Sequence, residues 1–401
     1  MKNWILSILL FTATANAFAK LSPLAPQPDW GDLNQFQETI THQEFLWLLE
    51  NVYAPGGAWS STIEVSENSA RIQTNGAPYI LRFAADIPSS KPVTRYWNAR
   101  RQLPPPPSGK PFTGLKIAID PGHLGGSWAK IEERWFQIGR SKPVTEGDMT
   151  LYVAKLLAPR LKELGAEVFL TRTKSDPVTP LRPKQLMGEA RKSLAQNGTS
   201  LTAWSLAKES ERLFYRTSEI RQRGKLVNER IRPDLVLCLH FNAEDWGNAE
   251  RPTLSDENHL HFLISGALNA TELAYDDQRF DMLYKLLSRS FGEELAVTRS
   301  VAAAMARQTN LPPFTYKGGN AINVGGNPYI WARNLLANRS YECPVVYVEP
   351  YVMNSREVFA RIQAGDYSGT QVFGGVQRKS IFREYADSLV EGLANYYSKR
   401  D

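Results

Sequence analysis

Apolar and polar positions follow two recognisable periods along most of this chain. Short, continuous apolar runs predict five buried strands, at residues 115–120, 167–172, 235–240, 261–265 and 345–349. Residues 148–164 and 382–397 instead repeat apolar side chains at the spacing of an amphipathic helix. Two apolar strands joined by a helix form a βαβ unit, which requires a parallel sheet. We therefore predict an α/β fold, a mostly parallel twisted sheet flanked by helices.

A second, smaller pattern precedes this sheet. It predicts a helix at 43–52 and three short strands at 62–65, 70–73 and 79–83. Residues 100–113 are rich in proline, which is typical of a stiff, solvated linker. The predicted organisation is a small α+β N-terminal domain at 20–99, this linker, and a larger domain at 114–401. Within the larger domain, residues 174–222 are too long for a simple connection and predict a basic helical insertion.

The first 19 residues have the pattern of a signal peptide. Lys2 precedes an apolar run at 4–11 and then small residues, with two A-x-A cleavage sites, after Ala17 or after Ala19. The apolar run is far shorter than the roughly 20 residues that span a bilayer. We therefore expect export to the periplasm or the extracellular space and a protein that is not an integral membrane protein. The two cysteines, Cys238 and Cys343, exclude a disulfide framework but leave a single bridge open.

The positive charge is concentrated in one region. The whole chain has a formal net charge of +6, and between residues 182 and 232 twelve Lys and Arg stand against five Glu. Such a segment is either a solvated helical face or a surface that meets an anionic polymer. No zinc-finger spacing, RNP aromatic pattern or basic zipper accompanies it, so we expect no nucleic-acid partner.

Four residues that carry chemistry stand at the ends of predicted elements. His123 follows the first strand, His240 ends the third, Glu349 ends the last, and Glu146 precedes the long helix. The carboxyl ends of parallel strands lie at one edge of a sheet, so these side chains can converge there. Two imidazoles and one carboxylate suit Zn²⁺ with a fourth position for water. A further carboxylate is then needed to move the proton.

The order of these residues resembles a known family. Residues 120–123 read D-P-G-H, residues 165–172 read G-A-E-V-F-L-T-R, and residues 234–243 read D-L-V-L-C-L-H-F-N-A. Residues 114–399 thus resemble the zinc-dependent N-acetylmuramoyl-L-alanine amidases of the amidase-3 family. The resemblance implies that His123, Glu146 and His240 bind Zn²⁺ and that Glu349 is the catalytic carboxylate. It also implies hydrolysis of the amide between N-acetylmuramic acid and L-alanine, with peptidoglycan as the partner.

The chain departs from the family pattern in several places. The interval between His123 and Glu146 is long and contains Glu132 and Glu133, either of which is an alternative third ligand. Cys238 replaces the usual serine. In some relatives an inserted helix covers the zinc until a partner removes it. For the 174–222 insertion this is a hypothesis, with an activator protein as the candidate partner.

The remaining candidates concern the substrate. Arg223, Asn242 and Asn354 belong to the matching motifs, and His261 lies in the alternating run that also holds His259. We expect Arg223, Asn242, His261 and Asn354 to bind substrate. Two other functions stay open at this point: a non-catalytic peptidoglycan-binding protein on the same fold, and a zinc peptidase that cuts within the stem peptide.

Overall fold

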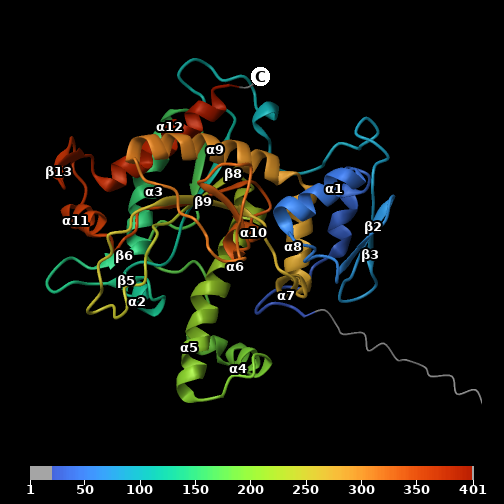
Figure 1. Ribbon diagram of the computed structural model, residues 1–401, viewed down its shortest axis with the longest axis horizontal. Helices are drawn as coiled ribbons and strands as arrows, with labels where there is room; N and C mark the ends of the chain where they lie inside the picture. The colour runs from blue at the N-terminus through green and yellow to red at the C-terminus, as the bar shows by residue number, and fades with distance from the viewer. Residues whose placement is uncertain (1–19, 400–401) are drawn as a thin grey trace, which may run out of the picture.

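A seven-stranded sheet forms the centre of the molecule (Figure 1). The computed structural model describes residues 20–399, so the predicted signal peptide lies outside the described residues. The strand order is β10-β11-β9-β12-β8-β4-β7. The strands are β4 (Lys116–Pro121), β7 (Glu167–Leu170), β8 (Leu235–Leu239), β9 (Leu260–Ser265), β10 (Ile322–Asn323), β11 (Ile330–Arg333) and β12 (Val345–Pro350). The five predicted strands are all present, which confirms the α/β prediction.

The sheet is mostly parallel, with one internal reversal. Strands β12, β8, β4 and β7 run parallel to one another, so their carboxyl ends share one edge. Strand β9 runs antiparallel to β12, and β11 follows the direction of β9. The reversal places His261, near the start of β9, directly opposite Glu349, near the end of β12.

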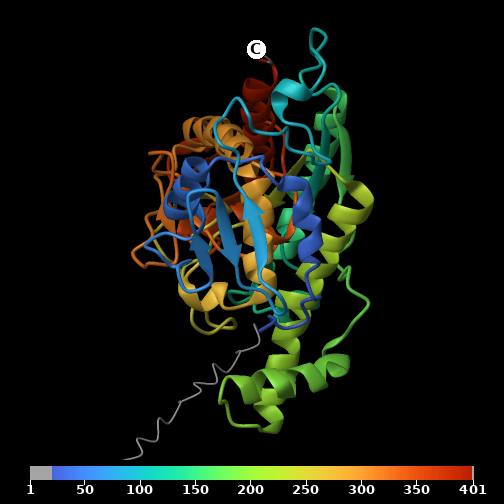
Figure 2. The ribbon, with the colours of Figure 1, turned by 90° about the vertical axis from the view of Figure 1, so that its right-hand side faces the viewer.

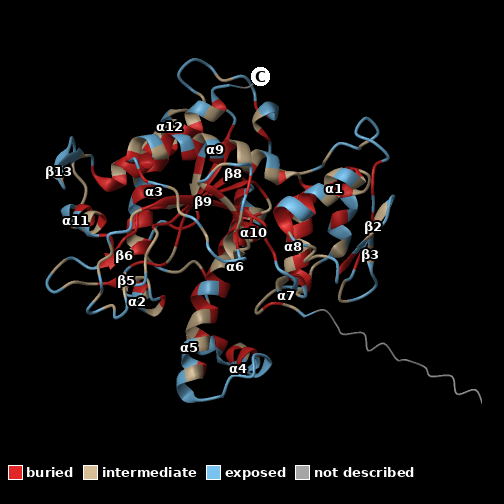
Figure 3. Ribbon diagram, in the orientation of Figure 1, coloured by how far each residue is buried: buried red, intermediate tan, exposed pale blue. Residues whose placement is uncertain are grey.

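Helices cover both faces of the sheet. On one face, α3 (Glu146–Glu163), α9 (Ser290–Thr309) and α12 (Ile381–Tyr397) pack together against alternate strand residues such as Ile117 and Leu237. On the other face, residues such as Val236 and Val345 form a separate buried cluster. Figure 3 shows this buried layer along the centre of the molecule. Alternation between two apolar faces explains why the strands read as continuous apolar runs.

The N-terminal region forms a small α+β unit beside the main sheet (Figure 2). It contains a 3-10 segment η1 (Trp30–Phe36), α1 (His42–Leu48), a π-type segment η2 (Leu49–Tyr53), and the antiparallel strands β1 (Ile63–Val65), β2 (Ser69–Ile72) and β3 (Tyr79–Arg82). Thr41 caps α1 in a capping box with Glu44. The buried side chains of this unit, such as Phe45 and Leu81, belong to the same apolar cluster as the main sheet.

The segment after this unit is short of regular structure. A 3-10 turn η3 (Arg100–Gln102) comes first, residues 104–110 are mostly exposed, and Phe112 is buried in the main core. Both cysteines are buried and free, so the single bridge left open by the sequence is absent.

Two helices of the basic helical insertion, α4 (Met187–Gln196) and α5 (Ala203–Leu213), project from the body of the molecule (Figure 1). The insertion also contains η4 (Pro183–Leu186), η5 (Phe214–Ser218) and the start of α6 (Glu219–Lys225), and η6 (Leu226–Ile231) follows beyond its end at residue 222. Half of the twelve basic side chains between residues 182 and 232 form ion pairs within the protein. These pairs leave fewer unpaired positive charges for an anionic polymer to contact. The paired residues are Lys192, Lys208, Arg212, Arg221, Arg223 and Lys225.

Short elements complete the fold around this framework. They are α2 (Trp128–Ile131), β5 (Trp135–Phe136), β6 (Val144–Thr145), α7 (Ala270–Leu273), α8 (Asp276–Leu287), α10 (Leu336–Ser340), α11 (Arg356–Ala364), β13 (Gln371–Phe373) and β14 (Val376–Arg378). Across residues 20–399, no helix has both the length and the apolarity that crossing a bilayer requires.

Candidate metal centre

Two histidines and one glutamate meet at the carboxyl edge of the sheet. His123 lies two residues beyond β4, His240 directly follows β8, and Glu146 is the first residue of α3. One ligand atom from each lies within 4.8 Å of the others. The structure thus brings together the three residues predicted to bind metal.

The Asp-Pro-Gly-His turn sets the position of His123. His123 has a φ of +60°, a left-handed conformation that few non-glycine residues adopt. Gly122 is needed for a different reason: a Cβ there would lie 2.2 Å from Cε1 of His240. The turn therefore lets the backbone after β4 approach the His240 ring closely. The rings of His123 and His240 pack edge to face, with their centres 4.9 Å apart.

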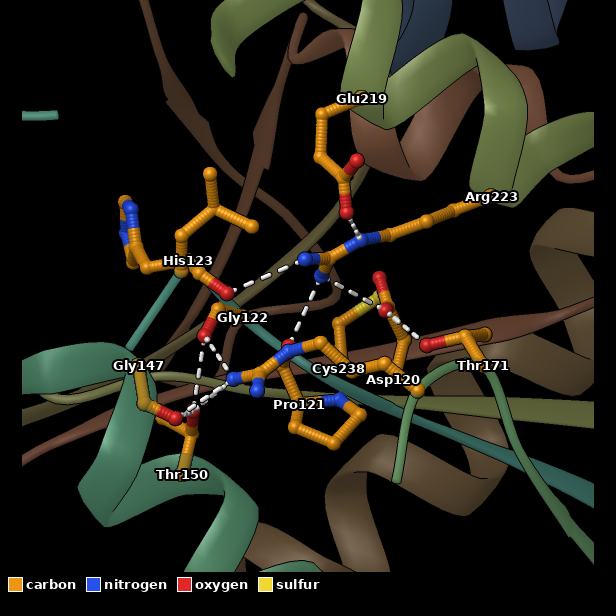
Figure 4. A network of polar contacts seen from close by, with 12 residues as sticks. Asp120, Pro121, Gly122, His123, Gly147, Thr150, Thr171, Glu219, Arg223 and Cys238 are labelled. Atoms are coloured by element: carbon orange, nitrogen blue, oxygen red, sulfur yellow. Dashed lines mark hydrogen bonds and ion pairs between the residues drawn. The ribbon is translucent and has the colours of Figure 1, made fainter. Parts of the chain in front are cut away.

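Two buried arginines hold this turn by its backbone carbonyls. Arg223 donates to the carbonyl oxygens of Pro121 at 2.8 Å and His123 at 3.0 Å (Figure 4). Arg172 donates to the carbonyl oxygens of Pro121 at 3.0 Å and Gly122 at 3.2 Å. A strained turn persists only where its surroundings define it, and these contacts supply that definition.

Asp120 anchors Arg223 beneath the turn (Figure 4). Its Oδ1 atom accepts from Arg223 at 3.0 Å and from the Thr171 hydroxyl at 2.6 Å, and its Oδ2 atom accepts from Tyr341 at 2.6 Å. Burial is the largest single influence on the pKa of Asp120 and raises it, but the charge of Arg223 and the hydrogen bonds from Thr171 and Tyr341 act together to lower that pKa. Glu219 completes the network through a 2.8 Å bond from Nε of Arg223.

Glu132 and Glu133, the alternatives to Glu146 as a ligand, lie in different places. Glu132 is buried, and its Oε1 lies 2.7 Å from Nδ1 of His123. Its Oε2 accepts from the backbone N–H of Leu124 at 2.6 Å. Glu133 is exposed and pairs with Lys208 at 3.1 Å. Glu132 therefore orients His123 from behind, whereas Glu146 reaches the other ring nitrogen, Nε2, at 3.3 Å.

Glu146 is also fixed on its other sides. Its Oε1 accepts from the backbone N–H of Phe241 at 3.1 Å and lies 3.2 Å from Nδ1 of His240. Arg134 approaches Oε2 at 3.6 Å. Gly147, the next residue, permits this position because a Cβ there would lie 2.1 Å from the carbonyl oxygen of Leu124.

A cavity of about 220 Å³ opens beside these residues. His123 and Glu146 line it together with Glu349 and with two of the predicted substrate-binding residues, Asn242 and His261. Burial is the largest cause that raises the pKa of Glu349, to about 7, and the charge of Glu146 adds to the rise.

The other two predicted substrate-binding residues have structural positions instead. Arg223 is 3% exposed and bonded to Asp120, Glu219 and the turn. Asn354 is fully buried, where it accepts from the backbone N–H of Glu244 and donates to the carbonyl oxygen of Thr253. Neither side chain lines the cavity, so we correct their expected role in substrate contact.

Several cavity residues carry no signal in the sequence. Arg134 lies in the loop directly before β5, and Arg333 is the last residue of β11. Phe314 and Tyr316 lie in an irregular segment, and Tyr316 bonds to Nε2 of His261 at 3.0 Å. Among residues 20–399, none from the 174–222 insertion lines the cavity. The hypothesis that this insertion covers the site is therefore not supported.

His123, Glu146 and His240 fit a zinc ion in donor type and in spacing. Zinc bonds to imidazole nitrogen and carboxylate oxygen are about 2.0–2.2 Å long, and tetrahedral donors then lie about 3.3–3.6 Å apart. Oε2 of Glu146 lies 3.3 Å from Nε2 of His123, and Oε1 of Glu146 lies 3.2 Å from Nδ1 of His240. A carboxylate behind a ligating histidine, as Glu132 is here, is typical of metal sites.

The electrostatics of the three side chains favour a cation. Burial lowers the pKa of His123 well below its usual value, and nearby Arg134 adds to this, which keeps the ring neutral as a ligand must be. Burial would also lower the pKa of His240, but its hydrogen bond with Glu146 and the charge of Glu349 outweigh burial and raise it. The carboxylates of Glu146 and Glu349 therefore favour a positive charge at the point where His123, Glu146 and His240 meet.

The fold and this site define an α/β protein with a two-histidine, one-carboxylate centre of the kind that holds a catalytic metal. A family model described as N-acetylmuramoyl-L-alanine amidase matches residues 117–378. That match covers well over half of the chain, and the protein belongs to this family. No curated protein matches the chain significantly.

Solved amidase structures are similar to this chain only distantly. Ami1 from Mycobacterium abscessus aligns at 17% identity with a TM-score of 0.37, over 71% of this chain and 99% of its own. AmiC2 of Nostoc punctiforme aligns at 15% identity with a TM-score of 0.37, over 71% and 98%. CwlD from Clostridioides difficile, solved in complex with the GerS lipoprotein, aligns at 11% identity with a TM-score of 0.37, over 71% and 98%. We draw no functional argument from likenesses at this level.

Proposed function

We propose that this protein is an exported, zinc-dependent amidase that hydrolyses the amide between N-acetylmuramic acid and L-alanine in peptidoglycan. One observation carries the proposal: Glu349 lines the same cavity as His123 and Glu146. These last two residues form the candidate metal centre together with His240. A metal centre beside a second, separate carboxylate is the arrangement that metal-assisted amide hydrolysis requires. Membership of the family supports the choice of bond.

The protein's own contribution starts with orientation. When bound, zinc supplies Lewis acidity, which polarises a carbonyl and makes water more acidic. Glu132 holds His123 through Nδ1 and leaves Nε2 facing Glu146. Tyr347 stacks on the His240 ring at 4.4 Å and limits its rotation. Side chains held in this way lose little freedom when ligand and substrate bind.

Glu349 is suited to move the proton. In the metal-free protein burial raises the pKa of Glu349 to about 7, so this carboxyl group is suited to accept and return a proton near neutral pH. The same group can therefore serve first as the base toward water and then as the acid toward the departing amine of L-alanine. Its position opposite His261 on β9 keeps it at the cavity.

Arg333 provides positive charge for the substrate. It donates to the Tyr316 hydroxyl at 3.2 Å, and in the part of the chain that is described it forms no ion pair with a carboxylate. A guanidinium that lines a cavity without a carboxylate partner suits carbonyl or carboxylate oxygens of a peptide. Arg134, in contrast, is already engaged with Glu146.

Mass spectrometry of digested muropeptides tests the proposal. We expect products with a free lactyl carboxyl group on muramic acid and peptides that begin with L-alanine. Cleavage within the stem peptide would instead assign the chain as a zinc peptidase, and intact muropeptides would leave a non-catalytic binding protein. Removal of metal by a chelator should abolish hydrolysis, and added Zn²⁺ should restore it.

A pair of variants separates catalysis from folding. Glu349→Gln should keep one equivalent of zinc by elemental analysis but lose about 100-fold or more of the hydrolysis rate, because the group that moves the proton is gone. Glu257→Gln, the same change at an exposed residue, serves as the matched control and should hydrolyse normally. Full activity in Glu349→Gln would contradict the assigned role.

Export has its own test. The proposal predicts that protein recovered from the periplasm or the medium begins at Phe18 or Lys20, which follow the two A-x-A sites. N-terminal sequencing of that protein measures this directly. Recovery only from the cytoplasm with residues 1–19 intact would overturn the export part of the proposal and leave the hydrolysis part standing.

A further inference from the structure

A second cavity has four arginines in its lining. It lies between residues 95–101, the start of α9 and the end of α12, and has a volume of about 480 Å³. Four arginines and one carboxylate, Glu293, line it, and one of the arginines, Arg289, also pairs with Glu44, which leaves a formal excess of two positive charges. The arginines are Arg95, Arg100, Arg101 and Arg289. This cavity shares no lining residue with the cavity at Glu349.

Two of these guanidinium groups are held in place by the surrounding protein. Arg95 donates to the carbonyl oxygen of Ser288 at 2.7 Å and lies 3.5 Å above the centre of the Trp97 ring. Arg289 donates to the carbonyl oxygen of Thr39 at 2.9 Å and to Glu44 at 3.0 Å. An anion that binds here would meet guanidinium groups that have already lost their rotamer freedom.

Hydrogen-bond donors at this cavity lack partners. The Nε atom of Arg95 and the Nε1 atom of Trp97 are both buried without a hydrogen-bond acceptor. Trp97 is only 2% exposed. Unpaired buried donors are costly, so the protein alone leaves the polar groups of this wall incompletely satisfied. Arg101 is exposed and forms no ion pair within residues 20–399.

The positive charges also repel one another. Burial is the main cause that lowers the pKa of Arg95 to about 10; the charge of Glu293 opposes this, and the charges of Arg101 and Arg289 lower it further. Helix α9, which has 20 residues, begins at this cavity, where Gly292 and Glu293 of its first turn form part of the lining. The positive end of the helix dipole therefore adds to the field of the arginines.

We propose that this cavity binds a phosphate group, either as free phosphate or as part of a lipid headgroup. The guanidinium fork matches the spacing of phosphate oxygens and can bind two of them at once. The cavity volume lies in the range of small-ligand sites, so there is room for a substituent on the phosphate. The site stands on residues apart from the metal centre and does not depend on the proposed amidase activity.

Calorimetric titration of the full chain with inorganic phosphate, at constant ionic strength, tests the site. We expect saturable binding at one site per chain. Arg101→Gln should weaken it by about tenfold or more, because one charge-assisted hydrogen bond is lost. The control is Arg140→Gln, which removes the same charge from an exposed residue outside the cavity and should bind phosphate normally. Absence of saturable binding, or equal weakening in both variants, would overturn the proposal.

Vesicle flotation identifies the source of the phosphate. If the wild-type protein floats with phosphatidylglycerol vesicles but not with phosphatidylcholine vesicles, and Arg101→Gln floats less, the ligand is an anionic lipid headgroup. Phosphate binding without flotation assigns phosphate that is not presented by a membrane. Hydrolysis of muropeptides should be unchanged in Arg101→Gln in either case, which separates this site from the proposed amidase activity.

Discussion

Gly122→Ala tests the contact that brings His123 and His240 together. A Cβ at residue 122 would lie 2.2 Å from Cε1 and 2.5 Å from Nε2 of His240. Carbon atoms in contact prefer about 3.5–4.0 Å, so either the ring or the turn must move by roughly 1 Å or more. The turn is tied down: the carbonyl oxygen of Gly122 accepts from Thr150 at 2.7 Å and from Arg172 at 3.2 Å. The His240 ring must therefore move away from residue 122, which disturbs its 3.2 Å contact with Glu146.

We expect Gly122→Ala to lower zinc affinity by about 100-fold, the order of loss that follows a 1 Å misplacement in a preorganised site. Competition with a chromophoric chelator measures the affinity, and circular dichroism shows whether the variant folds. Gly188→Ala, in α4, is the matched control, since a Cβ there meets no atom within 4 Å. It should leave zinc affinity unchanged and stabilise the helix by about 0.5–1 kcal/mol. A folded Gly122→Ala protein with wild-type zinc affinity would refute the argument.

Three further predictions follow from buried carboxylates. Glu132→Gln removes the charge behind His123 and should weaken zinc binding by about 10–100-fold in the same competition assay, whereas unchanged affinity would mean that Glu132 does not support the ligand. In the metal-free folded protein the pKa of Glu349 is raised to about 7, whereas in the unfolded chain this carboxyl group releases its proton near pH 4.5. The free energy of unfolding therefore falls as the pH rises from 4.5 to about 7. Urea unfolding should then find metal-free Glu349→Gln more stable than wild type by at most about 3 kcal/mol at pH 8 and equal to it at pH 4, while one constant difference at both pH values would contradict the shift. Asp120→Asn removes one of the two carboxylates that pair with buried Arg223, Glu219 being the other, and should cost about 1.5–3 kcal/mol in urea unfolding at pH 7. A cost under about 0.5 kcal/mol would show that the Asp120–Arg223 pair does not hold the turn.

The strands and the long helix were predictable from local patterns. Strands β4, β8 and β12 are buried on both faces, so each reads as an apolar run, and α3 follows as an amphipathic helix. Parallel strands then place their ends at one edge, which is why His123, His240 and Glu349 could be expected to converge. This reasoning needs only residue order and the rule for crossover connections.

The direction of β9 was beyond such reasoning. An apolar strand reads the same whether it runs parallel or antiparallel to its neighbour, because both faces are buried either way. The reversal of β9 against β12 puts His261 opposite Glu349 and brings β11, with Arg333, to the same region. Arg134, which lies in a loop directly before the two-residue strand β5, likewise leaves no periodic signal.

The sequence pattern thus determined the class of fold, the order of its elements and the four side chains that meet at one edge. Tertiary structure decided which of the buried charges face the cavity and which hold the protein together. Glu132 and Glu146 are both glutamates that follow His123 within a short stretch of the chain. Glu132 contacts Nδ1 of His123 from behind, whereas Glu146 contacts Nε2 and faces the candidate metal centre. Arg223 belongs to a motif shared with the family, but its guanidinium group binds Asp120 and the backbone of the turn. A side chain's role depends on partners distant in sequence, since burial and opposite charge act through space.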